Sequence, residues 1–230
     1  MCAATISTVD GCSPQGHVQV VGADLVQRTR DDWLESAKLA ALSFLLLPLA
    51  VFLHELGHFS IAILSGLPAQ LHATSVSGGA ELNAAPDWLV ACQTAAGPLA
   101  SLMMSIGGTI LYSRDADRRW ALALALGAAS RFLMPAAYLG ARLLFLVQGR
   151  VYAAQPVFDE HDFAAAVGLP PPVVTAAATL VLLGVIYWSF RQTERGRRIP
   201  YAVALLLGIS AAYISLVAIA PPILASYPGR

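Results

Sequence analysis

Five long apolar runs constrain the fold of this chain more than any other feature of its sequence. About 20 predominantly apolar residues form a helix that can cross the hydrocarbon core of a bilayer, and such a helix satisfies its own backbone hydrogen bonds. The 230-residue chain is 57% hydrophobic and only 12% charged, which excludes an ordinary soluble domain. We therefore predict an all-α polytopic membrane protein with about five transmembrane helices, formed by residues 39–65, 88–112, 120–147, 173–190 and 201–225.

Basic residues flanking these runs are distributed unevenly between the two sides of the membrane. One side has only Arg150 and Arg230. Because cytoplasmic loops are enriched in Lys and Arg, the sequence predicts that the N-terminus and the even-numbered loops are cytoplasmic. The abundance of Arg and Ala favours a bacterial source with a GC-rich genome, and hence a bacterial cell membrane. The side predicted to be cytoplasmic holds Arg28, Arg30, Lys38, Arg114, Arg118, Arg119, Arg191, Arg195, Arg197 and Arg198.

The chain divides into three parts by composition. Residues 1–32 form a polar N-terminal tail, which is expected to lie outside the membrane and lacks the pattern of a cleavable signal peptide. Residues 33–169 form a membrane core with three of the apolar runs, and residues 170–230 contain the last two.

Two places in the core are expected to depart from straight helix. Residues 71–82 alternate loosely between apolar and polar, and Gly78 and Gly79 suit a tight turn, so we predict a small β-hairpin between the first two spans. Arg131 and Pro135 interrupt the third run. Because Pro removes a helix hydrogen bond, this run is either one kinked helix or two shorter pieces.

Three ionisable side chains, His54, Glu55 and His58, lie within the first apolar run, in the sequence VFLHELGHFS (residues 51–60). Side chains four residues apart lie on one face of a helix, so the two imidazoles can bind the same metal ion. Glu55 then lies beside the ion and can take a proton from a water molecule that attacks a carbonyl group. This is the H-E-x-x-H arrangement of zinc metallopeptidases.

The membrane context strengthens the metal interpretation. A charge at bilayer depth costs about 2.5 to 3.5 kcal/mol, so ionisable groups this close together require a compensating partner, which a zinc ion supplies. The alternative is that the three groups face a polar crevice and form only hydrogen bonds.

Other classes of site and partner find no support in the sequence. The balance of 14 basic and 14 acidic residues gives no electrostatic reason to expect a nucleic-acid partner. Cys2, Cys12 and Cys92 lack the spacing of a disulfide framework or of a cysteine zinc site.

Two motifs in successive spans resemble the site-2 protease family of intramembrane zinc metallopeptidases. The first is HELGH at residues 54–58, and the second is the small-residue Gly-Pro motif TAAGPLAS at residues 94–101. The resemblance covers residues 39–169. It implies a zinc endopeptidase that hydrolyses peptide bonds in or near the membrane-spanning segments of substrate proteins. It also implies a β element that holds the substrate extended near the site, and a third zinc ligand, an Asp, from a later segment.

The segment QPVFDEHDFAAAVGLPPP (residues 155–172) holds the candidates for the third ligand, in place of the Leu-Asp-Gly found in many family members. Asp159 is the first candidate by similarity to divergent members of the family. Asp162, one helical turn on, is the second, and His161 is the third. Alternatively, Asp159, Glu160 and Asp162 stabilise the N-terminus of a helix, and one acid can bind metal while the others do so.

Two arginines in the third run have open roles. Arg131 either pairs with the acidic cluster, stabilises a developing oxyanion, or is accommodated by the break at Pro135. Arg142 lies on the same helical face and is expected to extend its charged group to the membrane surface.

Four further residues are expected to support the structure. Gly97 and Pro98 allow the second span to approach the first closely. Gln93 and Thr94 are predicted to form interhelical hydrogen bonds. His72 lies in the predicted hairpin, where a lone histidine is more often solvent-facing than a metal ligand.

The sequence thus predicts an intramembrane zinc endopeptidase with Zn²⁺ bound by His54, His58 and Asp159. Glu55 is the predicted catalytic residue, which takes a proton from water and passes it to the leaving amine. The rival is a catalytically silent homologue that acts as a metal-binding scaffold or binds a partner; the intact Glu55 opposes it, and the missing Leu-Asp-Gly favours it. A transporter would show inverted repeats, which we do not find in the sequence.

Overall fold

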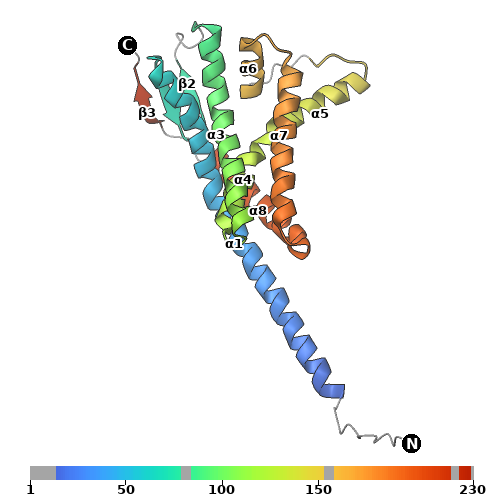
Figure 1. The fold of residues 1–230 in the computed structure, drawn as a ribbon. Helices are drawn as coiled ribbons and strands as arrows, with labels where there is room; N and C mark the ends of the chain where they lie inside the picture. Colours follow the sequence, from blue (N-terminus) through green and yellow to red (C-terminus); the bar gives the residue numbers. More distant parts are fainter. Residues whose placement is uncertain (1–13, 79–83, 153–157, 219–222, 229–230) are drawn as a thin grey trace, which may run out of the picture.

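The computed structural model describes residues 14–78, 84–152, 158–218 and 223–228 (Figure 1). Five helical segments are long and apolar enough to cross a membrane, which confirms the predicted all-α architecture and its number of spans. The fifth segment ends at Ala218, seven residues before the predicted end at residue 225. The segments are Asp32–Leu64, Asp87–Arg114, Arg119–Val147, Pro171–Gln192 and Arg195–Ala218.

The first helix, α1 (Pro14–Leu64), is 51 residues long and continues through the first span. Its N-terminal part, in the region predicted as a polar tail, is helical from Pro14 and projects away from the other helices (Figure 1). Its C-terminal part packs against α3 (Asp87–Arg114) and α8 (Arg198–Ala218). The HELGH motif therefore lies where α1 is surrounded by other helices.

The third span consists of two helices, α4 (Arg119–Ala129) and α5 (Leu133–Val147), joined by the 3-10 turn η1 (Ser130–Phe132). Pro135 has no N–H to donate to the carbonyl of Arg131, four residues earlier, which explains why the span breaks there. Of the two predicted alternatives, the structure has the two shorter pieces. Figure 1 shows α5 running obliquely outwards from the bundle.

The main apolar core lies where α1, α4 and α8 meet. Because lipid tails are as apolar as leucine, close packing rather than transfer from water holds such helices together. The buried side chains of this core include Leu39, Leu47, Leu122, Leu126, Leu205 and Ile209.

A small antiparallel hairpin follows α1 and confirms the predicted β element between the first two spans. Its strands are β1 (Ala69–His72) and β2 (Val76–Gly78), with Ala69 opposite Gly78. The turn is closed by a 2.8 Å hydrogen bond from the His72 N–H to the Ser75 carbonyl.

The predicted position of this turn is wrong. Residues 73–75 form the turn, whereas Gly78 is paired within β2 and Gly79 lies outside the described residues. The alternation that builds β1 begins at Ala69, which is buried, and continues with exposed Gln70 and buried Leu71. The hairpin therefore starts two residues before the segment chosen from the sequence.

A third strand, β3 (Ile223–Tyr227), pairs antiparallel with the other edge of β1 and gives the order β2-β1-β3. This strand lies in and just after the last predicted apolar run, of which it occupies residues 223–225. An apolar strand covered on one side has the composition of the end of a membrane span, which explains the error in that boundary.

The remaining helices are α6 (Asp159–Ala166) and α7 (Pro171–Gln192), and the turn η2 (Arg195–Arg197) precedes α8. Helix α6 packs against α3 and α7. It lies at the same end of the bundle as the hairpin and the C-terminal end of α1 (Figure 1). The acidic cluster and the HELGH motif are thereby brought together.

Candidate metal centre

Helix α1 presents His54 and His58 from successive turns towards α3. Their ring centroids are 4.8 Å apart. Glycines on both helices make this approach possible: a Cβ on Gly57 would lie 2.8 Å from the Ala96 carbonyl oxygen, and a Cβ on Gly97 would overlap the His58 imidazole. The predicted close contact of the Gly-Pro motif with the first span is therefore present, and it is made around a site residue.

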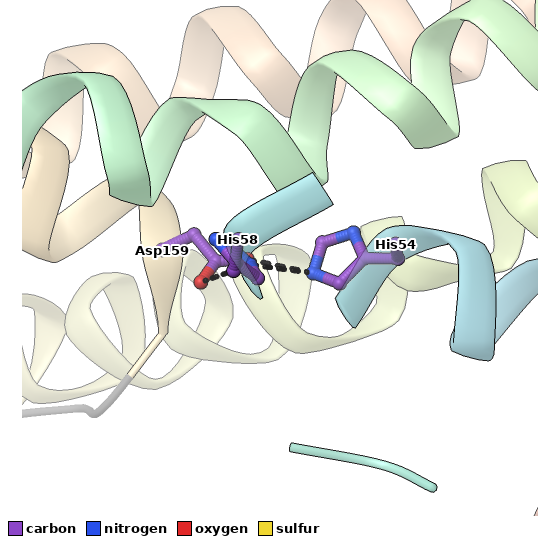
Figure 2. A group of neighbouring side chains, drawn as sticks. All are labelled: His54, His58 and Asp159. Atoms are coloured by element: carbon purple, nitrogen blue, oxygen red, sulfur yellow. Dashed lines mark hydrogen bonds and ion pairs between the residues drawn. The ribbon is translucent and has the colours of Figure 1, made fainter. Parts of the chain in front are cut away.

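Asp159, the first residue of α6, lies against both imidazoles (Figure 2). Its Oδ2 is 3.0 Å from His54 Nε2, and its Oδ1 is 3.3 Å from His58 Nε2. The two Nε2 atoms are themselves 3.2 Å apart. Of the three candidates for a third ligand, the structure thus brings Asp159 to the two histidines.

The other two candidates lie elsewhere on α6. The Asp162 side chain is 49% exposed, and its Oδ1 is 3.5 Å from His161 Nδ1. The ring of His161 packs near those of Phe158 and Tyr138. His72, in the hairpin, is hydrogen-bonded to Ser77 at 3.1 Å and is not part of the group.

Neighbouring groups fix both imidazoles through their Nδ1 atoms. His58 Nδ1 is 2.6 Å from the backbone carbonyl of Gln93, and because a carbonyl only accepts, Nδ1 carries the proton and Nε2 of the neutral ring is left with a lone pair. His54 Nδ1 is 3.0 Å from Ser101 Oγ. Such partners orient histidine ligands for a metal.

Sequence reasoning identified these supporting residues only in part. The Gln93 contact uses its backbone rather than its side chain, and the Thr94 hydroxyl donates to Val90 of its own helix instead of across helices, so the prediction for Thr94 is wrong. Ser101 was missed, although it is the last residue of the TAAGPLAS motif. A polar residue at the end of a small-residue motif was the available signal.

Arg131 in η1 joins the acidic cluster, one of the three roles that the sequence left open. Its Nη2 donates to Asp159 Oδ2 at 3.0 Å and to Glu160 Oε1 at 2.8 Å. Its Nη1 is 2.7 Å from His54 Nδ1. Glu160 is only 5% exposed, and its only role predicted from sequence was to stabilise the helix N-terminus. The need of a membrane arginine for a counter-ion was the signal for it.

Arg142 is not part of this cluster. Its Nη1 donates to the Tyr138 hydroxyl at 2.8 Å, and its guanidinium lies 5.6 Å from the centre of the same ring.

Charge at the site favours a divalent cation. Burial raises the pKa of the Asp159 carboxyl, but its contacts with His54 and His58 and the charge of Arg131 outweigh it and hold that pKa well below its usual range. Glu55 and Glu160 line the same cavity as Asp159, so three carboxyl groups lie near one guanidinium of the described residues, that of Arg131. A bound cation would supply a further positive charge for these carboxyl groups, and unpaired buried charge is costly.

The spacing of the donor atoms also fits a metal. The ligand atoms of His54, His58 and Asp159 all lie within 4.8 Å of one another, so this group could hold a metal ion. Donors at about 2.0 to 2.1 Å from a tetrahedral zinc ion are about 3.3 to 3.4 Å apart. The two Nε2 atoms, 3.2 Å apart, are close to that spacing, and Asp159 presents a different oxygen to each ring, Oδ2 at 3.0 Å from His54 and Oδ1 at 3.3 Å from His58.

A cavity of about 540 Å³ adjoins the group. Its polar lining includes Glu55, whose carboxylate faces the backbone N–H of Val76 in β2. The remaining polar lining residues are His54, Thr74, Ser101, Arg131, Asp159, Glu160 and Tyr213, and the large apolar ones include Val51, Met134, Phe158, Leu216 and Val217. Glu55, two of the three candidate metal ligands (His54 and Asp159) and an apolar wall thus share one space.

Comparison with known proteins adds no assignment to this geometry: no family model, curated protein or solved structure matches the chain.

Proposed function

We propose that the protein is an intramembrane zinc endopeptidase of the site-2 protease kind. The observation that carries the proposal is the meeting of His54 and His58, from one membrane helix, with Asp159, from a separate helix, beside a cavity that Glu55 also lines. Two histidines and a carboxylate leave one position open on a tetrahedral zinc ion, as in catalytic rather than structural zinc sites.

Glu55 is the acid-base group of this proposal. When bound, a zinc ion would lower the pKa of a water ligand and polarise the scissile carbonyl group. Glu55 takes a proton from the water molecule as the water oxygen bonds to the carbonyl carbon. The same proton then passes from Glu55 to the amide nitrogen as the C–N bond breaks, which leaves a carboxylic acid and an amine.

The surroundings of the site favour an extended, apolar substrate segment. Val51, Leu216 and Val217 give the cavity an apolar wall within the membrane spans. Strand β2 lies at one edge of the described sheet, and its Val76 faces Glu55. An edge strand can hold a peptide through main-chain hydrogen bonds, so we assign this role to β2, with the substrate unwound beside Glu55.

The orientation in the membrane is part of the proposal. The excess of Arg and Lys on one side of the spans supports a cytoplasmic N-terminus, and the composition supports a bacterial cell membrane. The metal site, near the opposite end of the bundle from the N-terminus, then lies towards the outer face.

The test combines zinc content with cleavage in the full-length protein reconstituted in lipid vesicles. The substrates are single-span reporter proteins with Gly, Asn or Pro at the centre of the span, and the products are read by mass spectrometry. We expect about one zinc per chain in the wild type and in Glu55→Gln, with cleavage only in the wild type, and neither zinc nor cleavage in His54→Ala.

Two results would contradict the proposal. Cleavage that persists in Glu55→Gln would remove the acid-base mechanism. A wild type that stays metal-free after zinc is offered would place the scaffold or partner-binding alternative first.

A further inference from the structure

Arg131 is the only basic side chain of the described residues that lines the cavity. It comes from η1, where the break before Pro135 interrupts the third span, and its side chain is 16% exposed. Keeping a guanidinium at this depth is costly unless it is paired. Some N–H groups of Arg131 have no acceptor among the described residues, and these free donors indicate a further role.

The N–H groups of Arg131 are unequally used. Nη2 is satisfied by two carboxylates, those of Asp159 and Glu160. Nε is buried and has no acceptor among the described residues. Nη1 contacts only His54, at 2.7 Å from Nδ1 and 3.3 Å from Nε2.

The contact between Nη1 and His54 is incompatible with metal binding by that histidine. A ring that binds a metal through Nε2 carries its proton on Nδ1. This Nδ1–H donates to Ser101 Oγ, 3.0 Å away, and cannot accept a hydrogen bond from Arg131. With His54 as a ligand, Nη1 therefore also has an unused N–H, next to the ligand group and inside the cavity.

We propose that Arg131 is a catalytic residue that donates hydrogen bonds to the oxygen of the scissile carbonyl group. The inference rests on the proposed peptidase function. As the water oxygen bonds to the carbonyl carbon, the π electrons of the C=O bond move to the carbonyl oxygen, and the N–H groups of Arg131 stabilise the negative charge that develops there. The guanidinium acts only as a hydrogen-bond donor throughout. Proton transfer belongs to Glu55 alone.

Glu160 is the positioning residue for Arg131. Its Oε1 accepts a 2.8 Å hydrogen bond from Nη2, and its Oε2 is buried without a hydrogen-bond partner in the described part of the chain. A carboxylate held at 5% exposure fixes one end of the guanidinium and leaves the other end to turn towards a substrate oxygen.

The experiment compares Arg131→Ala and Arg131→Lys with Arg142→Ala in the vesicle assay with the same reporters. Arg142 is the matched control, since it lies in the same span and bonds Tyr138 rather than the site. Loss of one oxyanion donor costs about 10²- to 10³-fold in kcat, so we expect that decrease in Arg131→Ala, with KM changed less than threefold and about one zinc per chain retained. Arg131→Lys should recover part of the lost kcat, and Arg142→Ala should resemble the wild type.

Two further readouts separate this role from a structural one. Millimolar guanidinium added to Arg131→Ala should restore part of kcat, because the free ion can enter the space of the missing side chain. At saturating zinc, Glu160→Gln should lower kcat less than Arg131→Ala does, and the double variant should be no slower than Arg131→Ala, since positioning matters only while Arg131 is present.

The outcomes distinguish this inference from the proposed function. A wild type that cleaves, with unchanged kcat in Arg131→Ala, overturns the role of Arg131 and leaves the peptidase intact. Loss of zinc in both Arg131→Ala and Arg131→Lys also overturns it, because Arg131 would then serve only to hold Asp159. A zinc-loaded wild type that cleaves none of the reporters overturns the proposed function and this inference with it.

Discussion

Helix α1 passes through two clusters of charge, and their composition differs. Near its polar end, Glu35 forms ion pairs with Arg119 and Lys38, and Asp32 pairs with Arg197, so each of these two acids has at least one cation of its own. Around HELGH, three carboxyl groups, those of Glu55, Asp159 and Glu160, share a cavity with one guanidinium of the described residues, that of Arg131.

This difference in the balance of acidic and basic groups indicates different roles for the two clusters. Matched ion pairs tie helices together, and the hydrogen bond from Arg119 Nε to the Tyr201 hydroxyl does the same at the polar end. A buried excess of negative charge does not stabilise a helix bundle by itself, because each unpaired charge costs several kcal/mol. The excess of acidic groups beside His54 and His58 is what we expect of a group that could hold a cation.

The largest effect is expected from removing the carboxylate that lies between the histidines. Asp159→Ala should lose zinc and all cleavage, because two histidine ligands remain and the charge that balances the ion falls by one. Asp162→Ala is the matched control: its carboxylate is half exposed, lies three residues further along the same helix, and should leave zinc and cleavage unchanged. The zinc content per chain of the two variants is measured by mass spectrometry. Equal zinc in both would contradict the assignment of Asp159 as the third ligand.

Removing the metal should lower the thermal stability of the protein only when Asp159 is intact. A ligand at about 1,000 times its Kd stabilises the folded state by about 4 kcal/mol, so chelation should lower the Tm of the wild type by several degrees. The Tm of Asp159→Ala should not respond to the chelator. A wild-type Tm that is equally insensitive would mean that the excess negative charge is balanced by protons and not by metal.

A smaller effect is expected at Ser101, whose hydroxyl is the partner of His54 Nδ1. Removing such a partner typically weakens metal affinity by 10- to 100-fold, which we expect for Ser101→Ala in competition with a chromogenic chelator. Ser105→Ala is the control, because that hydroxyl is equally buried but bonds the backbone of Ser101. Identical affinities of the two variants would contradict the assigned role of Ser101.

The smallest effects are expected when one Glu in each cluster is replaced by Gln. The two substitutions should differ in whether they change stability or zinc affinity. Glu35→Gln should lower stability by about 1 kcal/mol, the usual range for partly exposed ion pairs, with zinc affinity and kcat unchanged. Glu160→Gln, which removes one of the three acids near the metal, should instead weaken zinc binding. Thermal unfolding and zinc titration of both variants test this, and equal zinc affinity in the two would remove the distinction between the clusters.

The spans and the two histidines could be predicted from sequence because both signals are local. Apolar length determines whether a segment can cross a bilayer, and the spacing of His54 and His58 on one helix determines that they share a face. Asp159 could be narrowed to one of three candidates, because its segment is the acidic one on the appropriate side of the membrane.

The partners of the site could not be predicted, because they depend on which helices meet. Gln93 contributes a backbone carbonyl, which every residue has, and Ser101 is one of many small residues on α3. Whether Arg131 reaches Glu160 depends on the break in the third span and on the packing of α6. Strand β3 could not be predicted for a similar reason. Its pairing with β1 joins segments far apart in the chain, and its composition suits a membrane span.

The position of β3 has a consequence for biogenesis. This strand follows all five spans in chain order, yet it completes the pairing of β1, which lies just after the first of them. During synthesis, one edge of β1 therefore lacks its partner strand until the remaining spans have been synthesised. The hairpin next to Glu55 reaches its final form only at that stage, so a nascent chain completes this side of the candidate site late, after the five spans have been synthesised.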